Sequence, residues 1–315
     1  MKFLFILLSL VIIAIAPFNG QIDLTLTNIF EPSKMDYQIF WDIRLPRVVL
    51  AFCVGAILAL SGLVFQTIFR NPMSTPFTLG VASGATLFTA IGIVFGFVTF
   101  ISLFAFMGAV LTIILLFLIA ARFHGAQTSS LLLVGIALSF FYSASLMVLF
   151  FISDLQESYE IVRFTMGSLD IVGFQSIYLV ILAALFILSI VTRYQYHIKL
   201  LLTSYDFATL KGINVKKTNY ILLLSVSIVV GICVSITGPI GFVGLIIPHI
   251  IKIIAKTSAD KLILPIFFYG GVFLVLCDVI ARNTGATSDI PIGVVTSFVG
   301  APFFIYLLLT KRKKS

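Results

Sequence analysis

The most constraining feature of the sequence is a series of apolar runs that are each long enough to cross a lipid bilayer as a helix. The run from Val48 to Phe69 is an example. Only helices and closed barrels satisfy all backbone polar groups inside lipid, and these runs lack the period-two alternation of barrel strands. The sequence therefore predicts an all-α, polytopic transmembrane bundle.

The composition excludes several other classes of protein. Apolar residues make up 60% of the 315 residues, charged residues 10%, and the mean hydropathy is +1.19. A soluble core of ordinary proportions could not bury this much apolar surface. The net charge of +8 does not predict nucleic-acid binding, because the basic residues lie between and beyond the apolar runs. Cys53, Cys233 and Cys277 lie within apolar runs without CxxC spacing, so we expect neither disulfides nor a structural zinc site.

Apolar runs and helix breakers predict about ten spans. Their approximate bounds are 2–19, 46–69, 79–98, 101–121, 129–152, 173–193, 218–237, 241–256, 262–281 and 290–310. The eighth is short and rich in Gly and Pro, so hydropathy also allows nine spans with a re-entrant or surface helix there. The first could be a signal peptide, but Pro17 directly after the Ala-Ile-Ala triplet argues against cleavage, and we interpret it as a retained span.

The distribution of charge favours ten spans. With a cytoplasmic N-terminus, 15 of the 20 Lys and Arg residues lie inside, and nearly all acidic residues lie outside. Nine spans would place the terminal KRKK outside, which the positive-inside rule disfavours. We therefore expect both termini to be cytoplasmic. Because no polar connection is long enough for a soluble domain, residues 1–315 are expected to form a single transmembrane domain.

Small and polar residues interrupt the second span. Gly55, Ser61, Gly62 and Gln66 should face protein or a pathway rather than lipid. The span ends at Arg-Asn-Pro, residues 70–72, which cannot continue a helix. In the third span, glycines recur at four-residue steps, which predicts close approach of another helix. These glycines are Gly80, Gly84, Gly92 and Gly96.

Five motifs occur in a specific order from about Arg44 to the C-terminus. They are RLPR, RNPM, GPIGFVGLIIPH, Asp278-x-x-x-Arg282 and PIGVVTSFVGAPFF. This combination resembles the FecCD-type permeases, the membrane subunits of ABC importers for iron chelates, haem and vitamin B12. The resemblance implies a type II ABC importer fold, a location in the bacterial plasma (inner) membrane and an iron-chelate cargo.

The resemblance also implies several partners. Two ATP-binding subunits would carry ATP and Mg, a second permease subunit would be identical or closely homologous, and a periplasmic or lipid-anchored solute-binding protein would deliver the cargo. No cofactor is expected on this chain. The sequence has no G-x-x-x-x-G-K-[ST] loop, no H-E-x-x-H and no Ser/His/Asp arrangement in one polar loop, so we expect no catalytic residues. The three histidines are dispersed, so no metal site is expected either.

Three arginines at outer span ends are candidates for binding-protein docking. Arg44, Arg47 and Arg282 are the main basic residues on a face that is otherwise acidic. A guanidinium group matches carboxylates in geometry, so it could orient a partner with surface Asp or Glu, as the resemblance implies. The alternative is that Arg44 pairs with Asp42 and Arg282 with Asp278 as helix-end ion pairs.

The cytoplasmic segment 203–218 is the candidate for coupling to the ATPase. Its sequence suggests two short helices joined by a tight turn, with Ser204 as N-cap, Gly212 as left-handed stop and Asn214 as the next N-cap. The resemblance makes this the element that fits the ATP-hydrolysing subunit. The coupling residues would be Ser204, Asp206, Phe207, Ala208, Gly212 and Val215. A solvated loop without a partner is the alternative.

The fifth span supplies candidate pathway and gate residues. Small hydroxyl side chains could line a wet passage, and the resemblance implies a gate near a twofold axis. The candidates are Thr128, Ser129, Ser130, Ser139, Tyr142 and Ser143. Capping explains Thr128 or Ser129 equally well.

Two other functions remain open from the sequence. An ATPase-independent secondary transporter or channel is the first alternative, although such carriers usually show buried intramembrane charges, and no cluster of them marks a substrate site here. A membrane anchor without transport is the second alternative, and it would have no accessible cavity.

Overall fold

The computed structural model describes residues 2–122, 128–255, 259–284 and 289–311. Within these ranges the chain is helical and contains no strand, which confirms the expected all-α class. The α-helices are α1 (Lys2–Ile15), α2 (Met35–Gln38), α3 (Leu45–Ile68), α4 (Val81–Val94), α5 (Ile101–Arg122), α6 (Thr128–Ile152), α7 (Leu155–Met166), α8 (Ile177–Arg193), α9 (Gln195–Thr203), α10 (Tyr205–Leu210), α11 (Val215–Thr237), α12 (Val243–Ala255), α13 (Ile263–Thr284) and α14 (Ile292–Lys311). A π-helical turn, Ile39–Arg44, leads into α3.

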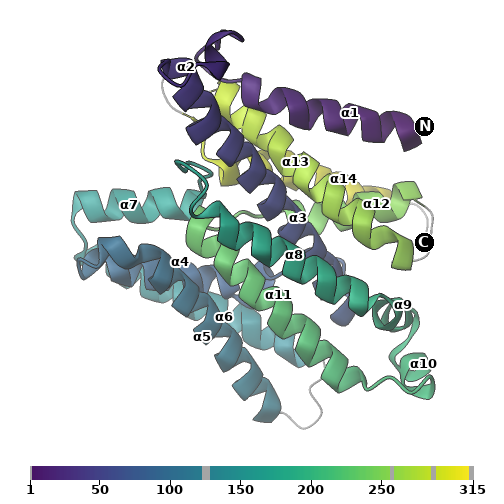
Figure 1. Cartoon of the computed structure of the whole chain (residues 1–315). Helices are drawn as coiled ribbons and strands as arrows, with labels where there is room; N and C mark the ends of the chain where they lie inside the picture. Colours follow the sequence, from purple (N-terminus) through teal and green to yellow (C-terminus); the bar gives the residue numbers. More distant parts are fainter. Residues whose placement is uncertain (1, 123–127, 256–258, 285–288, 312–315) are drawn as a thin grey trace.

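Helix α3 is the central element of the bundle (Figure 1). It packs against α13, α12, α8 and α11, and 89% of its most apolar window is buried inside the protein. Gly55, Ser61, Gly62 and Gln66 are all buried, which confirms that this span faces protein on those sides. At Gly62 a Cβ would lie 1.7 Å from the carbonyl oxygen of Gly244 in α12, so only glycine allows the two backbones to approach this closely.

Helices α4 and α5 form a second close pair. A Cβ on Gly84 would lie 2.0 Å from Thr112 Oγ1, and one on Gly108 would lie 2.3 Å from the carbonyl oxygen of Gly84. The predicted packing role of the glycines in the third span is therefore confirmed at Gly84, whereas Gly96 has open space around it.

Each of the ten expected apolar segments coincides with a helix. In the part of the chain that the structure describes, five helical stretches are long and apolar enough to cross a membrane, and the bent pair of α8 and α9 would make a sixth span. Four further apolar helices are shorter, α12 among them, so the number of ten spans remains a prediction. Helices α2 and α7 and the 60° bend between α8 and α9 were not expected.

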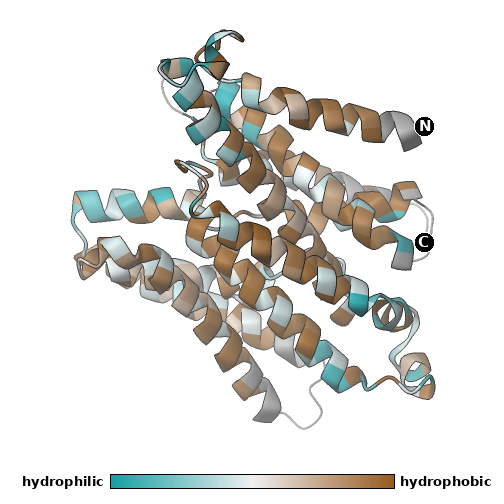
Figure 2. Cartoon of the chain, viewed as in Figure 1, coloured by the Kyte–Doolittle hydropathy of each residue, from teal (hydrophilic) through white to brown (hydrophobic). Residues whose placement is uncertain are grey.

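Polar residues gather at two ends of the bundle (Figure 2). One end carries α2 and α7, and the other carries α9, α10 and the start of α11 (Figure 1). Helix α1 begins and α14 ends toward the second end. We call the end with α2 and α7 the outer end and the end with α9 and α10 the inner end.

Candidate functional site

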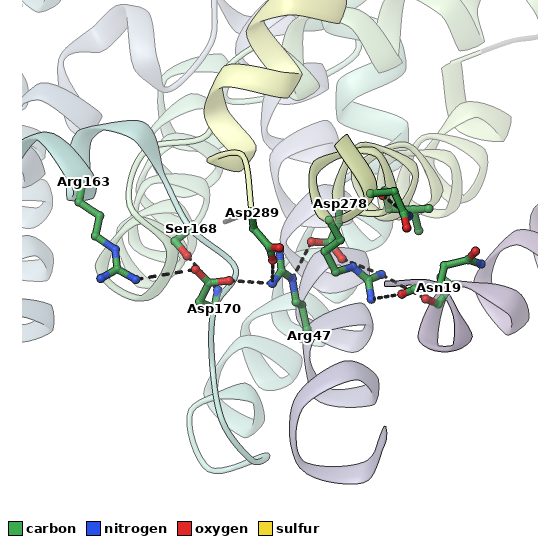
Figure 3. A network of polar contacts seen from close by, with 11 residues as sticks. Asn19, Arg47, Arg163, Ser168, Asp170, Asp278 and Asp289 are labelled. Atoms are coloured by element: carbon green, nitrogen blue, oxygen red, sulfur yellow. Dashed lines mark hydrogen bonds and ion pairs between the residues drawn. The ribbon is translucent and has the colours of Figure 1, made fainter. Parts of the chain in front are cut away.

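The outer end contains a buried ionic network centred on Arg47 (Figure 3). Arg47 Nε donates to Asp278 Oδ1 at 2.8 Å, and Arg47 Nη1 lies 2.7 Å from Asp170 Oδ1 and 2.6 Å from Asp289 Oδ2. Asp278 is fully buried, whereas the side chains of Asp170 and Asp289 are 46% and 30% exposed. One guanidinium group thus joins α3 to α13, to the segment after α7 and to the segment before α14.

Arg282 extends this network toward the N-terminal helix. Its Nη2 lies 3.0 Å from Asp278 Oδ2, and its Nη1 and Nη2 donate to the carbonyl oxygens of Asn19 and Ala16. The alternative expectation of an Arg282–Asp278 pair is therefore confirmed. Because Arg47 and Arg282 bind the same carboxylate, the buried charge of Asp278 is well compensated.

Arg44 has a different environment from the other two arginines. Its Nη1 donates to the carbonyl oxygen of Phe18 at 3.1 Å, and its Nη2 donates to that of Ile22. These bonds replace the expected pair with Asp42, because the chain after α1 folds back over the guanidinium group. Backbone carbonyls satisfy the N–H groups of Arg44 without neutralising its charge.

All three candidate docking arginines are buried in this structure, with exposed fractions of 4–7%. The sequence suggested an open basic surface, but each guanidinium group is covered by partners from distant parts of the chain. The exposed part of this network is Asp170, which also lies 3.9 Å from the exposed Arg163. Docking of a solute-binding protein thus remains a prediction. A partner would contact the outer surface that these buried arginines stabilise, rather than the arginines themselves.

The inner end carries the candidate coupling segment. Gly212 has a φ of +81° and ends α10, and Asn214 Oδ1 accepts a hydrogen bond from Lys217 N at 3.0 Å, so both predicted roles are confirmed. Ser204 precedes α10 in an extended conformation, but its side chain makes no capping bond. The second expected short helix is in fact the first turns of α11.

The short helix α10 has a buried and an exposed face. Ala208 packs in a small core with Leu200, Leu201 and Ile213, with Val215 at its edge. Asp206, Phe207, Leu210 and Gly212 are exposed, with exposed fractions of 84% at Leu210 and 41% at Phe207. An anchored helix that displays apolar side chains at the polar end of a bundle is suited to bind a protein partner.

The pathway candidates on α6 separate into two groups. Tyr142 is buried among α4, α5 and α6 and hydrogen-bonds to Thr112 across 3.1 Å, so it does not line an open route in this structure. Ser143 is exposed, and Ser139 lines a cavity of about 390 Å³ with residues of the 71–78 segment. Thr128, Ser129 and Ser130 start α6, but their side chains lie outside the described part of the chain.

Comparison with known proteins identifies the family. The sequence matches the FecCD transport family over residues 4–310. The chain belongs to this family. This FecCD chain is 34% identical to the hemin transport system permease protein HmuU of Yersinia pestis, and the alignment covers 98% of the chain and 96% of the relative. It is 39% identical to a probable iron chelatin transport system permease protein of Helicobacter pylori, over 87% and 83% of the two chains.

The fold comparison agrees with the sequence comparison. A solved structure described as an inward-facing conformation of a metal-chelate type ABC transporter superposes on this FecCD chain with a TM-score of 0.88 at 30% identity. The match covers 98% of this chain and 99% of the other. The expected class, a transport permease of the ABC type in a membrane, is thereby confirmed.

Several structural residues were missed from the sequence. Asp170 and Asp289 were expected outside but were not paired with Arg47, and the only available signal was that all of them belong to the same outer end. Arg70 lies beside the ring of Tyr205 and so joins the end of α3 to α10, but the sequence gave no sign that these two residues meet. Helix α7 could have been predicted, because Asp154 and Glu157 form a capping box at its start.

Proposed function

We propose that this chain is the membrane-spanning permease subunit of a binding-protein-dependent ABC importer for an iron chelate, haem or cobalamin. Its relatives in Yersinia pestis and Helicobacter pylori are described as permeases for hemin and iron chelatin. The observation that carries the proposal is the exposed helix α10 at the polar inner end, opposite the arginine network at the outer end. The two ends thus offer one surface for an ATPase and another for a binding protein.

The proposed assembly joins this chain to three kinds of partner. Two ATP-binding subunits, which hold ATP and Mg, contact segment 203–218 from the cytoplasm through Asp206, Phe207 and Gly212. A second permease subunit, identical or closely homologous, faces α6, of which only 11% is buried within this chain. A solute-binding protein docks at the outer end. The permease lies in the bacterial plasma membrane with both termini cytoplasmic.

The proposed transport step requires no covalent chemistry in this chain. ATP binding would move the two ATPases, and α10 would pass this movement to the spans, which alternate access between the two faces. Ser139, Ser143 and the start of α6 from Thr128 to Ser130 would line the inner part of the passage. Tyr142 would instead fix α6 against α5.

Co-purification with the ATP-binding subunit tests the proposed inner surface. Leu210→Asp should abolish co-purification, because a charge replaces an apolar contact of the proposed interface. Leu155→Asp is the matched control, since Leu155 is 92% exposed and lies at the outer end. Equal effects of the two variants would contradict the assignment. Uptake of labelled haem, a ferric siderophore and cobalamin with the cognate binding protein would then identify the cargo.

A further inference from the structure

A clasp joins the inner end of α3 to the start of α10. Arg70, two residues beyond the last residue of α3, donates from Nη2 to the carbonyl oxygen of Thr203 at 3.0 Å. The Cζ of Arg70 also lies 5.2 Å from the ring centroid of Tyr205, the first residue of α10. In return, the Tyr205 hydroxyl donates to the carbonyl oxygen of Ile68, the last residue of α3. Each side therefore binds the other through both a side chain and the backbone.

The backbone of Arg70 is in an unfavourable conformation for its residue type. Its φ is +49°, and among the described residues only Arg70 and Phe242 are non-glycine residues with positive φ. Glycine is the usual residue at a left-handed helix end, and the chain uses it at Gly80 and Gly212. An arginine at this position is therefore disfavoured by the backbone, and its side-chain contacts must compensate for that cost.

Helix α3 is suited to carry a displacement from one end of the bundle to the other. It is the central buried helix, and its outer end is held by Arg47 in the ionic network. Near its inner end, Gln66 Nε2 donates to the carbonyl oxygen of Gly244 in α12 at 3.1 Å. A movement of α10 that reaches α3 would consequently reach α12 and α13 as well.

We propose that Arg70 and Tyr205 form the contact through which α10 transmits the movement of the ATPase to α3. This inference rests on the proposed function of the chain as an ABC importer permease. Both residues act as positioning residues that touch neither cargo nor nucleotide. Coupling of hydrolysis to transport should then depend on the clasp, whereas assembly with the ATPase should depend on the exposed face of α10.

Arg70→Gly tests this proposal because it removes the side chain and also relieves the backbone. In proteoliposomes with the ATPase and the binding protein, this variant should assemble normally and hydrolyse ATP, and its melting temperature should not fall. Cargo molecules imported per ATP should decrease about tenfold, which corresponds to about 1.4 kcal/mol of lost coupling. Arg70→Lys, which keeps a cation near the Tyr205 ring, should restore part of the loss. Tyr205→Phe should also give a partial loss, since it removes the hydrogen bond to Ile68 but keeps the ring that Arg70 contacts.

Arg193→Ala is the matched control. Arg193, the last residue of α8, is an exposed arginine near the same end of the bundle and lies outside segment 203–218. Normal import per ATP in Arg70→Gly, or an equal loss in Arg193→Ala, would overturn the proposal. A lower melting temperature or failed assembly of Arg70→Gly would also overturn it, because the role would then be structural. If the unmodified chain itself imported cargo without ATP, the proposed function would fail instead, and the two failures are thus distinguishable.

Discussion

Arg47 on α3 and Asp278 on α13 lie 231 positions apart in the sequence and form a buried hydrogen-bonded ion pair of 2.8 Å. Both helices belong to the central packing of the bundle, and the pair closes that packing at its outer end (Figure 3). Arg282 and the carboxylates of Asp170 and Asp289 complete the network. The outer ends of the central helices are therefore held by charge as well as by apolar contact.

Asp278→Asn should lower the stability of the permease strongly. The substitution removes the carboxylate that Arg282 pairs with and one of the three that Arg47 pairs with. Breaking a buried ion pair by removing one charge typically costs about 3–5 kcal/mol. Thermal unfolding in detergent measures the effect. Arg163→Ala is the control, since the exposed Arg163–Asp170 contact should contribute less than about 1 kcal/mol. Equal shifts of the two melting temperatures would show that the network is not important for stability.

Gly62→Ala should prevent normal packing of α3 against α12. The new Cβ would lie 1.7 Å from the Gly244 carbonyl oxygen, so the helices would have to separate. We expect a loss of monodisperse protein in gel filtration. Gly241→Ala should be tolerated, because Gly241, which shortly precedes α12, has open space around its Cα. A monodisperse Gly62→Ala protein with an unchanged melting temperature would contradict this packing.

Gly212→Val should reduce transport per ATP while hydrolysis continues. A β-branched residue at a φ of +81° costs about 1–2 kcal/mol, and the relaxation of this strain should turn α10 relative to α11. Gly96→Val is the matched control, since Gly96 also has a positive φ and open space but lies in the outer turn after α4. Normal coupled uptake by Gly212→Val would mean that segment 203–218 is not the coupling element.

Arg44→Gln should weaken docking of the binding protein more than it affects stability. The guanidinium group of Arg44 binds carbonyl oxygens, so its positive charge is available to attract partner carboxylates over about one Debye length. Binding of the solute-binding protein should decrease most at low salt, with ATPase assembly unchanged. Arg163→Gln is the control, because it removes one positive charge from the outer end without touching Arg44. If Arg44→Gln left docking and its salt dependence unchanged, Arg44 would have no part in docking.

The sequence allowed the helices to be predicted well, because apolar length and helix breakers are local signals. The end of α3 before Pro72, the turn at Gly212 and the cap at Asn214 all followed from residue type. Burial of the arginines did not follow, since Arg47 meets partners that lie 123 to 242 positions away. The contact of Arg70 with Tyr205 did not follow either, because it depends on the 60° bend between α8 and α9, which the sequence did not predict.

ATP-dependent uptake by purified components tests the central proposal most directly. The permease, its ATP-binding subunits and the binding protein are placed in liposomes, and entry of the labelled chelate is measured with ATP and Mg, with a non-hydrolysable ATP analogue, and without the ATPase. The proposal predicts accumulation only when the ATPase is present and hydrolyses ATP. Accumulation at the same rate without the ATPase would show that the chain is an independent transporter or channel.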